Sequence, residues 1–177
     1  MDISDVSNIN DLLFITTAAI VVDVVVIFLV KYAGERPSFG VKALNEWYDR
    51  FGIFAVGADI ISLIIGVVAA RYIYSALFKE WNVMLFLLIV VLFQACHDIF
   101  FYISTIIRLP RSENGMIDVF QDYAKENGAW ILLADAAMMV STAVGAMALK
   151  AMPTHYTYSG LLVTLYSLCF IVFTKSP

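Results

Sequence analysis

Four aspartates and one histidine lie inside the apolar stretches of this 177-residue chain: Asp23, Asp59, His97, Asp98 and Asp135. A charge near the centre of a bilayer costs about 2.5–3.5 kcal/mol even on the most lenient insertion scale. No lysine or arginine lies at the same depth in these stretches to balance the acids. The carboxyl groups must therefore hold protons, hold a cation or line water, so the sequence indicates chemistry on a proton or another small cation.

These five residues share a depth as well as a chemistry. If the apolar helices cross a membrane alternately, each residue lies on the inner side of its helix centre, by roughly 3–6 Å at a rise of 1.5 Å per residue. Unrelated residues would scatter in depth. We therefore predict one interior cluster in which at least one acid stays protonated at neutral pH, because four acids and one histidine cannot all ionise in a low-dielectric site.

Helical spacing aims the acids into protein. Asp59 belongs to a stripe of small residues, which let a neighbouring backbone approach closely. Asp98 and Asp135 lie on the polar faces of their helices. The predicted hydrogen-bonding neighbours of the cluster are Gln94, Ser62, Tyr102 and Thr142.

The composition is that of a membrane protein, with 62% hydrophobic and 15% charged residues, compared with about 25% charged residues in soluble domains. Five apolar segments approach the ~20 residues that span hydrocarbon, and all four prolines lie outside them. The predicted spans are Leu12–Val30, Phe51–Tyr72, Val83–Ile107, Ala129–Leu149 and Tyr158–Thr174.

Two connections have an amphipathic pattern of their own. Val41–Tyr48 and Met116–Tyr123 each place apolar residues on one helical face, which is typical of a short helix on a membrane surface. Such helices could anchor loops, or they could form a docking or gating surface. The predicted fold is a single all-α domain over residues 1–177: a polytopic bundle of five transmembrane helices with two short interfacial helices on the inner side.

The basic residues predict an orientation. Eight of the 11 lysines and arginines follow the first, third and fifth spans, and three lie on the opposite side: Arg71 at the end of the second span, Lys79 and Lys150. The positive-inside rule then places the N-terminus outside and the C-terminus in the cytoplasm of a membrane that the sequence does not name. The chain opens with Asp2 and Asp5 rather than basic residues, so we expect no cleavable signal peptide.

Several familiar cofactors do not fit. Retinal needs a lysine deep in the membrane, and a membrane haem with two axial histidines needs a second buried histidine, whereas His155 lies in a connection. The acids and His97 show no recognised metal-ligand spacing, so we favour a protein that is not an enzyme without excluding one. Membrane lipids and a proton or bound cation are the expected partners; nucleic acid is not, and a homo-oligomer stays open.

One resemblance bears on the source. The run Asp122-Tyr123-Ala124-Lys125-Glu126-Asn127-Gly128, with Asp135-Ala136-Ala137-Met138-Met139 after it, resembles segments of uncharacterised membrane proteins of large DNA viruses. The resemblance covers about 20 residues and implies a membrane of the virion or the infected cell. It carries no established chemistry and suits a structural protein as well as a transporter.

The leading functional prediction is a membrane protein that handles protons or another cation as a channel, carrier or sensor. The alternative is a structural or assembly protein, of a viral membrane if the resemblance holds. In that alternative the buried acids are protonated and join helices by hydrogen bonds, each worth about 0.6–2 kcal/mol.

Overall fold

The computed structural model describes residues 1–32 and 42–174, and its regular elements in these ranges are helices. In chain order they are α1 (Asp11–Tyr32), α2 (Lys42–Phe51), α3 (Ile53–Leu77), α4 (Val83–Phe101), the π-helical turn η1 (Tyr102–Ile106), α5 (Gly115–Asn127), α6 (Trp130–Ala151) and α7 (Thr154–Phe173).

Five of these helices are long and apolar enough to cross a membrane: α1, α3, α4 continued by η1, α6 and α7. The prediction of an all-α protein with five spanning and two short helices is confirmed, and the chain is an integral membrane protein. Helix α7 begins four residues before the predicted start, directly after Pro153, which sets the backbone for a first turn. Val41, Arg36 and Lys175, which entered the sequence argument, lie outside the described residues.

Local signals account for the helix boundaries. The side chains of Asn82 and Asn114 cap α4 and α5 by accepting backbone N–H groups of the first turn. Each short helix joins the next spanning helix at a glycine with positive φ: Gly52 (+52°) ends α2, and Gly128 (+53°) ends α5. A side chain is strained at such an angle, so glycine permits these abrupt changes of direction.

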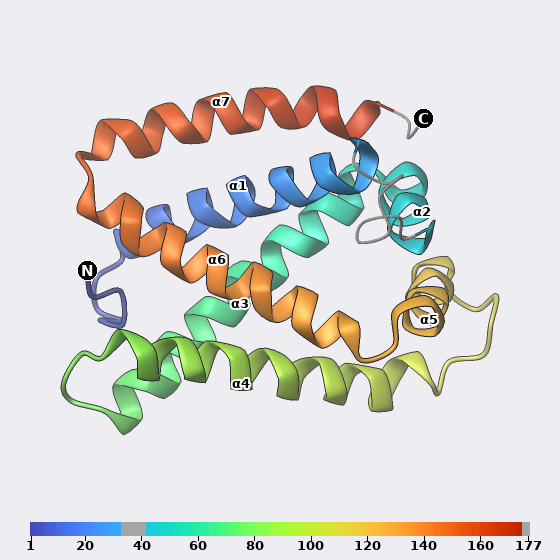
Figure 1. Cartoon of the computed structure of the whole chain (residues 1–177), viewed down its shortest axis with the longest axis horizontal. Helices are drawn as coiled ribbons and strands as arrows, with labels where there is room; N and C mark the ends of the chain where they lie inside the picture. Colours follow the sequence, from blue (N-terminus) through green and yellow to red (C-terminus); the bar gives the residue numbers. More distant parts are fainter. Residues whose placement is uncertain (33–41, 175–177) are drawn as a thin grey trace.

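Successive spanning helices run in opposite directions, and α1 lies at the centre of the bundle (Figure 1). It packs against α3, α6 and α7, while α4 packs against α3 and α6 on the far side from α7. The two short helices pack against each other at one end, which we call the α2–α5 end. The chain begins at the opposite end, the N-terminal end. Both short helices were predicted on the same side of the membrane as each other, and both lie at the same end of the bundle.

Two apolar cores fill the bundle, one towards each end. The core near the N-terminal end includes Ile15, Ala19, Leu63, Val67, Phe86 and Met139. The core near the α2–α5 end includes Ile27, Trp47, Tyr48, Val56, Val119 and Leu168. Along α1 and α3 the predicted acid occurs where one core gives way to the other. Helices α4 and α6 contribute buried residues to the core near the N-terminal end, and Asp98 and Asp135 lie beyond these residues towards the α2–α5 end.

Candidate functional site

The acids occupy the level between the two apolar cores. Along α1, Asp23 lies between Ala19 of one core and Ile27 of the other. Along α3, Asp59 separates Val56 from Leu63 in the same way. We call Asp23, Asp59, Asp98 and Asp135 the acid layer. Its four carboxyl groups interact in a chain, because Asp59 acts electrostatically on both Asp23 and Asp135, and Asp135 is next to Asp98.

Asp98 and Asp135 form the closest pair of the layer. Their carboxyl groups, one from α4 and one from α6, lie within hydrogen-bonding reach of each other. Gln94 donates its side-chain N–H to Asp98 Oδ1 over 2.6 Å, and His97 Nδ1 lies 3.2 Å from the same oxygen. The other oxygen, Oδ2, is buried without an N–H donor. Two carboxyl groups this close are attractive only when they share a proton, so the pair is chemically able to hold one.

Asp59 is held by the short helix α2. Its Oδ2 accepts a hydrogen bond from the indole Nε1 of Trp47 (3.1 Å) and another from the phenol of Tyr48 (2.9 Å). Both aromatic side chains are buried, and their hydrogen bonds hold α2 against α3 on the α2–α5 side of the acid layer. Neither residue was predicted to contact an acid, because their helix was expected to lie on the membrane surface. The sequence does contain a signal for this contact: two adjacent aromatic residues that can donate hydrogen bonds, Trp47 and Tyr48, shortly before Gly52 and Asp59.

Two phenols face the acid layer from the α2–α5 end. Burial, and then the negative fields of Asp59 and Asp23, raise the pKa of Tyr48 well above its usual value. Burial likewise raises the pKa of Tyr123 on α5, with added contributions from Asp135, Asp59 and Asp98. Both phenols therefore stay protonated at neutral pH and remain hydrogen-bond donors. Tyr48 thus donates a hydrogen bond from an uncharged phenol to Asp59, and Tyr123 places a second uncharged phenol near the layer.

Asp23 is the most isolated member of the acid layer. It is fully buried in α1, and neither carboxyl oxygen has a hydrogen-bond partner among the described residues. A buried ionised carboxylate without a partner is strongly unfavourable, whereas a protonated one is far cheaper. Asp23 is therefore a position where a proton must reside, unless a cation or water supplies the missing partner.

The other predicted neighbours are arranged differently. Ser62 donates to the backbone oxygen of Asp59 (2.8 Å) rather than to its carboxylate. Thr142 is buried but donates to Met138 O of its own helix (2.9 Å). Tyr102 is 47% exposed in the π-helical turn η1, one turn beyond Asp98. Of the four predicted neighbours, Gln94 is the one whose side chain bonds a carboxylate of the layer. His97 is also more exposed than expected, at 51% of its side chain.

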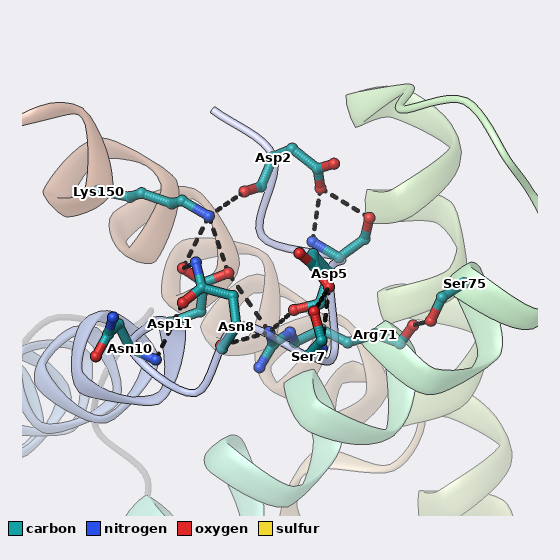
Figure 2. Close-up of polar contacts among 10 residues, drawn as sticks. Asp2, Asp5, Ser7, Asn8, Asn10, Asp11, Arg71, Ser75 and Lys150 are labelled. Carbon is teal, nitrogen blue, oxygen red and sulfur yellow. Dashed lines mark hydrogen bonds and ion pairs between the residues drawn. The ribbon is translucent and has the colours of Figure 1, made fainter.

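A cluster of paired charges lies at the N-terminal end, away from the acid layer. Asp11 is fully buried and pairs with Lys150 (2.8 Å) and Arg71 (3.4 Å) from α6 and α3, as Figure 2 shows. We call these three residues the ion cluster. Arg71 and Lys150 also donate to backbone oxygens of the segment before α1, among them those of Asp2 and Asp5.

The ion cluster was not predicted. Arg71 and Lys150 were counted with the basic residues that determine the orientation, and neither was expected to pair with Asp11. None of the lysines and arginines that the structure describes is among the charges that act on the four acids. Within residues 1–32 and 42–174, no three His, Cys, Asp or Glu side chains are grouped as ligands of one metal ion would be.

Comparisons of the chain with models of protein families, with curated proteins and with solved structures found no match.

Proposed function

We propose that this integral membrane protein binds and releases protons at the acid layer, as a proton carrier, channel or sensor. The observation that carries the proposal is the Asp98–Asp135 pair, in which two carboxyl groups within hydrogen-bonding reach need a shared proton. Asp23, buried without a partner, extends the same requirement to α1. Intramembrane acids with no fixed counter-charge commonly mark proton paths.

The packing on either side of the layer fits controlled access better than an open pore. Towards the N-terminal end lies an apolar core that includes Val67, Phe86 and Met139. Towards the α2–α5 end, Trp47 packs on Phe120 with ring centroids 4.8 Å apart, so aromatic side chains close that side. A proton would have to enter past Trp47 and the phenols of Tyr48 or Tyr123, which lie between the α2–α5 end and the layer.

The proposed orientation puts the α2–α5 end in the cytoplasm and the N-terminus outside. Its support is the distribution of basic residues: Lys42, Arg50, Arg111 and Lys125 belong to the α2–α5 end. At the N-terminal end, by contrast, Arg71 and Lys150 are engaged with Asp11. Labelling of single cysteines, placed at residue 125 or residue 79, with an impermeant thiol reagent in intact cells tests this orientation.

Purified protein in liposomes that contain a pH-sensitive dye tests the function. We expect proton uptake in the wild type, and its loss in Asp98→Asn, because asparagine keeps the shape of the side chain but cannot exchange a proton. Asp122→Asn is the matched control, since Asp122 is exposed and pairs with Arg111 outside the spans. A panel of metal-ion gradients, run beside the proton gradient, identifies the ion if a cation other than the proton moves.

Infrared spectra separate a sensor, which need not conduct, from a protein without proton chemistry. A carboxyl C=O band that persists at neutral pH and is lost in Asp98→Asn or Asp135→Asn supports a shared proton. If all four acids are ionised at neutral pH and no flux occurs under any gradient, the proposal is wrong.

A structural or assembly role is the second candidate, and one contact favours it. The bonds from Trp47 and Tyr48 to Asp59 fix α2 against α3, which is what an interhelical hydrogen bond does in a scaffold. In that case Asp98→Asn leaves the thermal melt nearly unchanged and the wild type shows no flux. The resemblance to viral membrane proteins supports this candidate as readily as the first.

A further inference from the structure

A groove opens on the outer surface of the bundle between α3 and α4. Its volume is about 190 Å³. The α3 side of the groove carries small residues one helical turn apart together with Ile61 and Ile65, and the α4 side is more polar. The small residues on α3 are Ala58, Ser62 and Gly66, and α4 contributes Phe93, Gln94 and His97.

His97 at the edge of this groove is poorly suited to face lipid. Half of its side chain is exposed (51%), at the level of the acid layer. Among the described residues of the five spanning helices, the other Asp, Lys and Arg side chains are buried or half-buried. Hydrocarbon chains offer no hydrogen-bond partner, so an imidazole in contact with them is costly. A protein surface that brings polar atoms to this depth would remove that cost.

Helix α4 is also the spanning helix that the bundle covers least. Of its most apolar stretch, 11% of the residues are buried, compared with 44% for α1. The same helix exposes large side chains, among them Leu92 (55%) and, one turn after His97, Phe100 (71%). Large side chains next to a groove floored by small residues form a surface that can interlock with its own copy.

We propose that the α3–α4 groove and the exposed face of α4 bind a second copy of this chain. The reason to choose a second copy is depth. A two-fold axis along the membrane normal places every residue opposite its own depth on the partner. His97 then meets the partner's Asp98 and the partner's Gln94 at the level where it needs a polar neighbour. The side chain of Asp98 is 15% exposed; its Oδ2 is buried, and its Oδ1 contacts Gln94 and His97 of the same copy, so Oδ1 is the oxygen that a partner's imidazole would share.

The contact is complementary in charge as well as in shape. Each copy offers one imidazole and one partly exposed carboxyl, and the two-fold axis pairs them twice. Lipid acyl chains could fill the groove but would leave His97 Nε2 without a partner, because the hydrogen-bond contact of the ring within its own copy is that of Nδ1 with Asp98 Oδ1. This inference does not depend on proton handling, because it concerns where the second copy binds and applies equally to a scaffold.

The two native cysteines provide a matched experiment. Cys96 is exposed on α4 beside His97, and Cys169 is exposed on α7. These helices lie on opposite edges of the bundle (Figure 1). We would prepare Cys169→Ala, which keeps Cys96, and Cys96→Ala, which keeps Cys169. Both would be treated with a short membrane-permeable bismaleimide in dilute proteoliposomes. The proposal expects a covalent dimer through Cys96 and monomer when Cys169 is the remaining thiol.

Two substitutions then test what holds the dimer. We expect Ser62→Trp, which fills the groove, to abolish Cys96 cross-linking, while Leu162→Trp at an exposed site on α7 leaves it intact. We expect His97→Leu to weaken the dimer about tenfold or more, the size expected for a polar contact made twice within a membrane. Fluorescence energy transfer between labelled copies measures this equilibrium, and thermal melts check that each variant folds.

Equal cross-linking through Cys169 would overturn the proposal, as would a wild-type protein that stays monomeric in bilayers. An unchanged or tighter dimer in His97→Leu would show that the histidine contributes no contact between copies and would also reject the proposal. Proton flux plays no part in these readouts, so failure here is distinguishable from failure of the proposed function.

Discussion

Two buried carboxyl groups on the same helix show two ways of keeping an acid inside a membrane protein. Asp11 and Asp23 both belong to α1 and are both fully buried. Asp11 is surrounded by Lys150, Arg71 and the side-chain amide of Asn8, so its negative charge is matched where it lies. Asp23 has no hydrogen-bond partner among the described residues.

The difference follows from position along the helix. Asp11 is in the first turn, at the N-terminal end, where the tips of long basic side chains from α3 and α6 can reach it. Asp23 lies between the two apolar cores, where such a charge would itself be desolvated. The ion cluster therefore stabilises ionised groups, whereas the acid layer favours neutral ones. A charge-removing substitution should accordingly reduce stability much more in the ion cluster than in the acid layer.

The largest expected effect is that of Asp11→Asn. Removing one partner of a buried ion pair leaves the remaining charges uncompensated and typically costs about 3–5 kcal/mol. In this variant Arg71, which is 3% exposed, and Lys150 would both lose the carboxylate with which they pair. Unfolding in mixed detergent micelles measures the loss. Glu46→Gln is the control, because its pair with Arg50 is exposed and worth about 0–1 kcal/mol. Equal losses in the two variants would remove the contrast between the regions.

An intermediate effect is expected for Tyr48→Phe. The substitution deletes the phenol that donates to Asp59 and leaves the ring packed in its core. A hydrogen bond of this kind contributes about 0.5–1.5 kcal/mol, and up to about 3 kcal/mol if the acceptor is charged. The measured loss therefore reports the charge state of Asp59: a small loss indicates a protonated carboxyl and a large one a carboxylate. Tyr166→Phe, at an exposed site on α7, is the control.

The smallest effect is expected for Asp23→Asn, although the residue is as buried as Asp11. If Asp23 carries a proton, the amide replaces one neutral group by another of nearly the same shape, and stability should change by less than about 1 kcal/mol. The same unfolding assay, run beside Asp11→Asn, makes the pair a direct comparison of one substitution on one helix. A loss of several kcal/mol at position 23 would mean that Asp23 is ionised and bound to a cation.

Much of the architecture could be predicted because its signals are local. Hydrophobic runs of membrane-spanning length, prolines outside them and amphipathic periods of 3.6 residues suffice to predict five spanning helices and two short ones. The common level of Asp23, Asp59, Asp98 and Asp135 also follows from the sequence, because helical rise converts position along a span into depth. Gln94 bonds Asp98 because the two residues are four apart on one helix, and such a pair is local too.

Contacts between helices were decided by the tertiary structure alone. The amphipathic pattern of α2 shows that Trp47 and Tyr48 are apolar-facing, but the positive φ at Gly52 determines that they turn towards Asp59. Asp11 meets Lys150 across 139 residues of chain, and helical periodicity contains no information about that distance. The sequence by itself determined which groups lie at which depth. Packing determined which of them meet, because the energy of a buried charge depends on neighbours from other helices, and only the folded bundle brings those neighbours together.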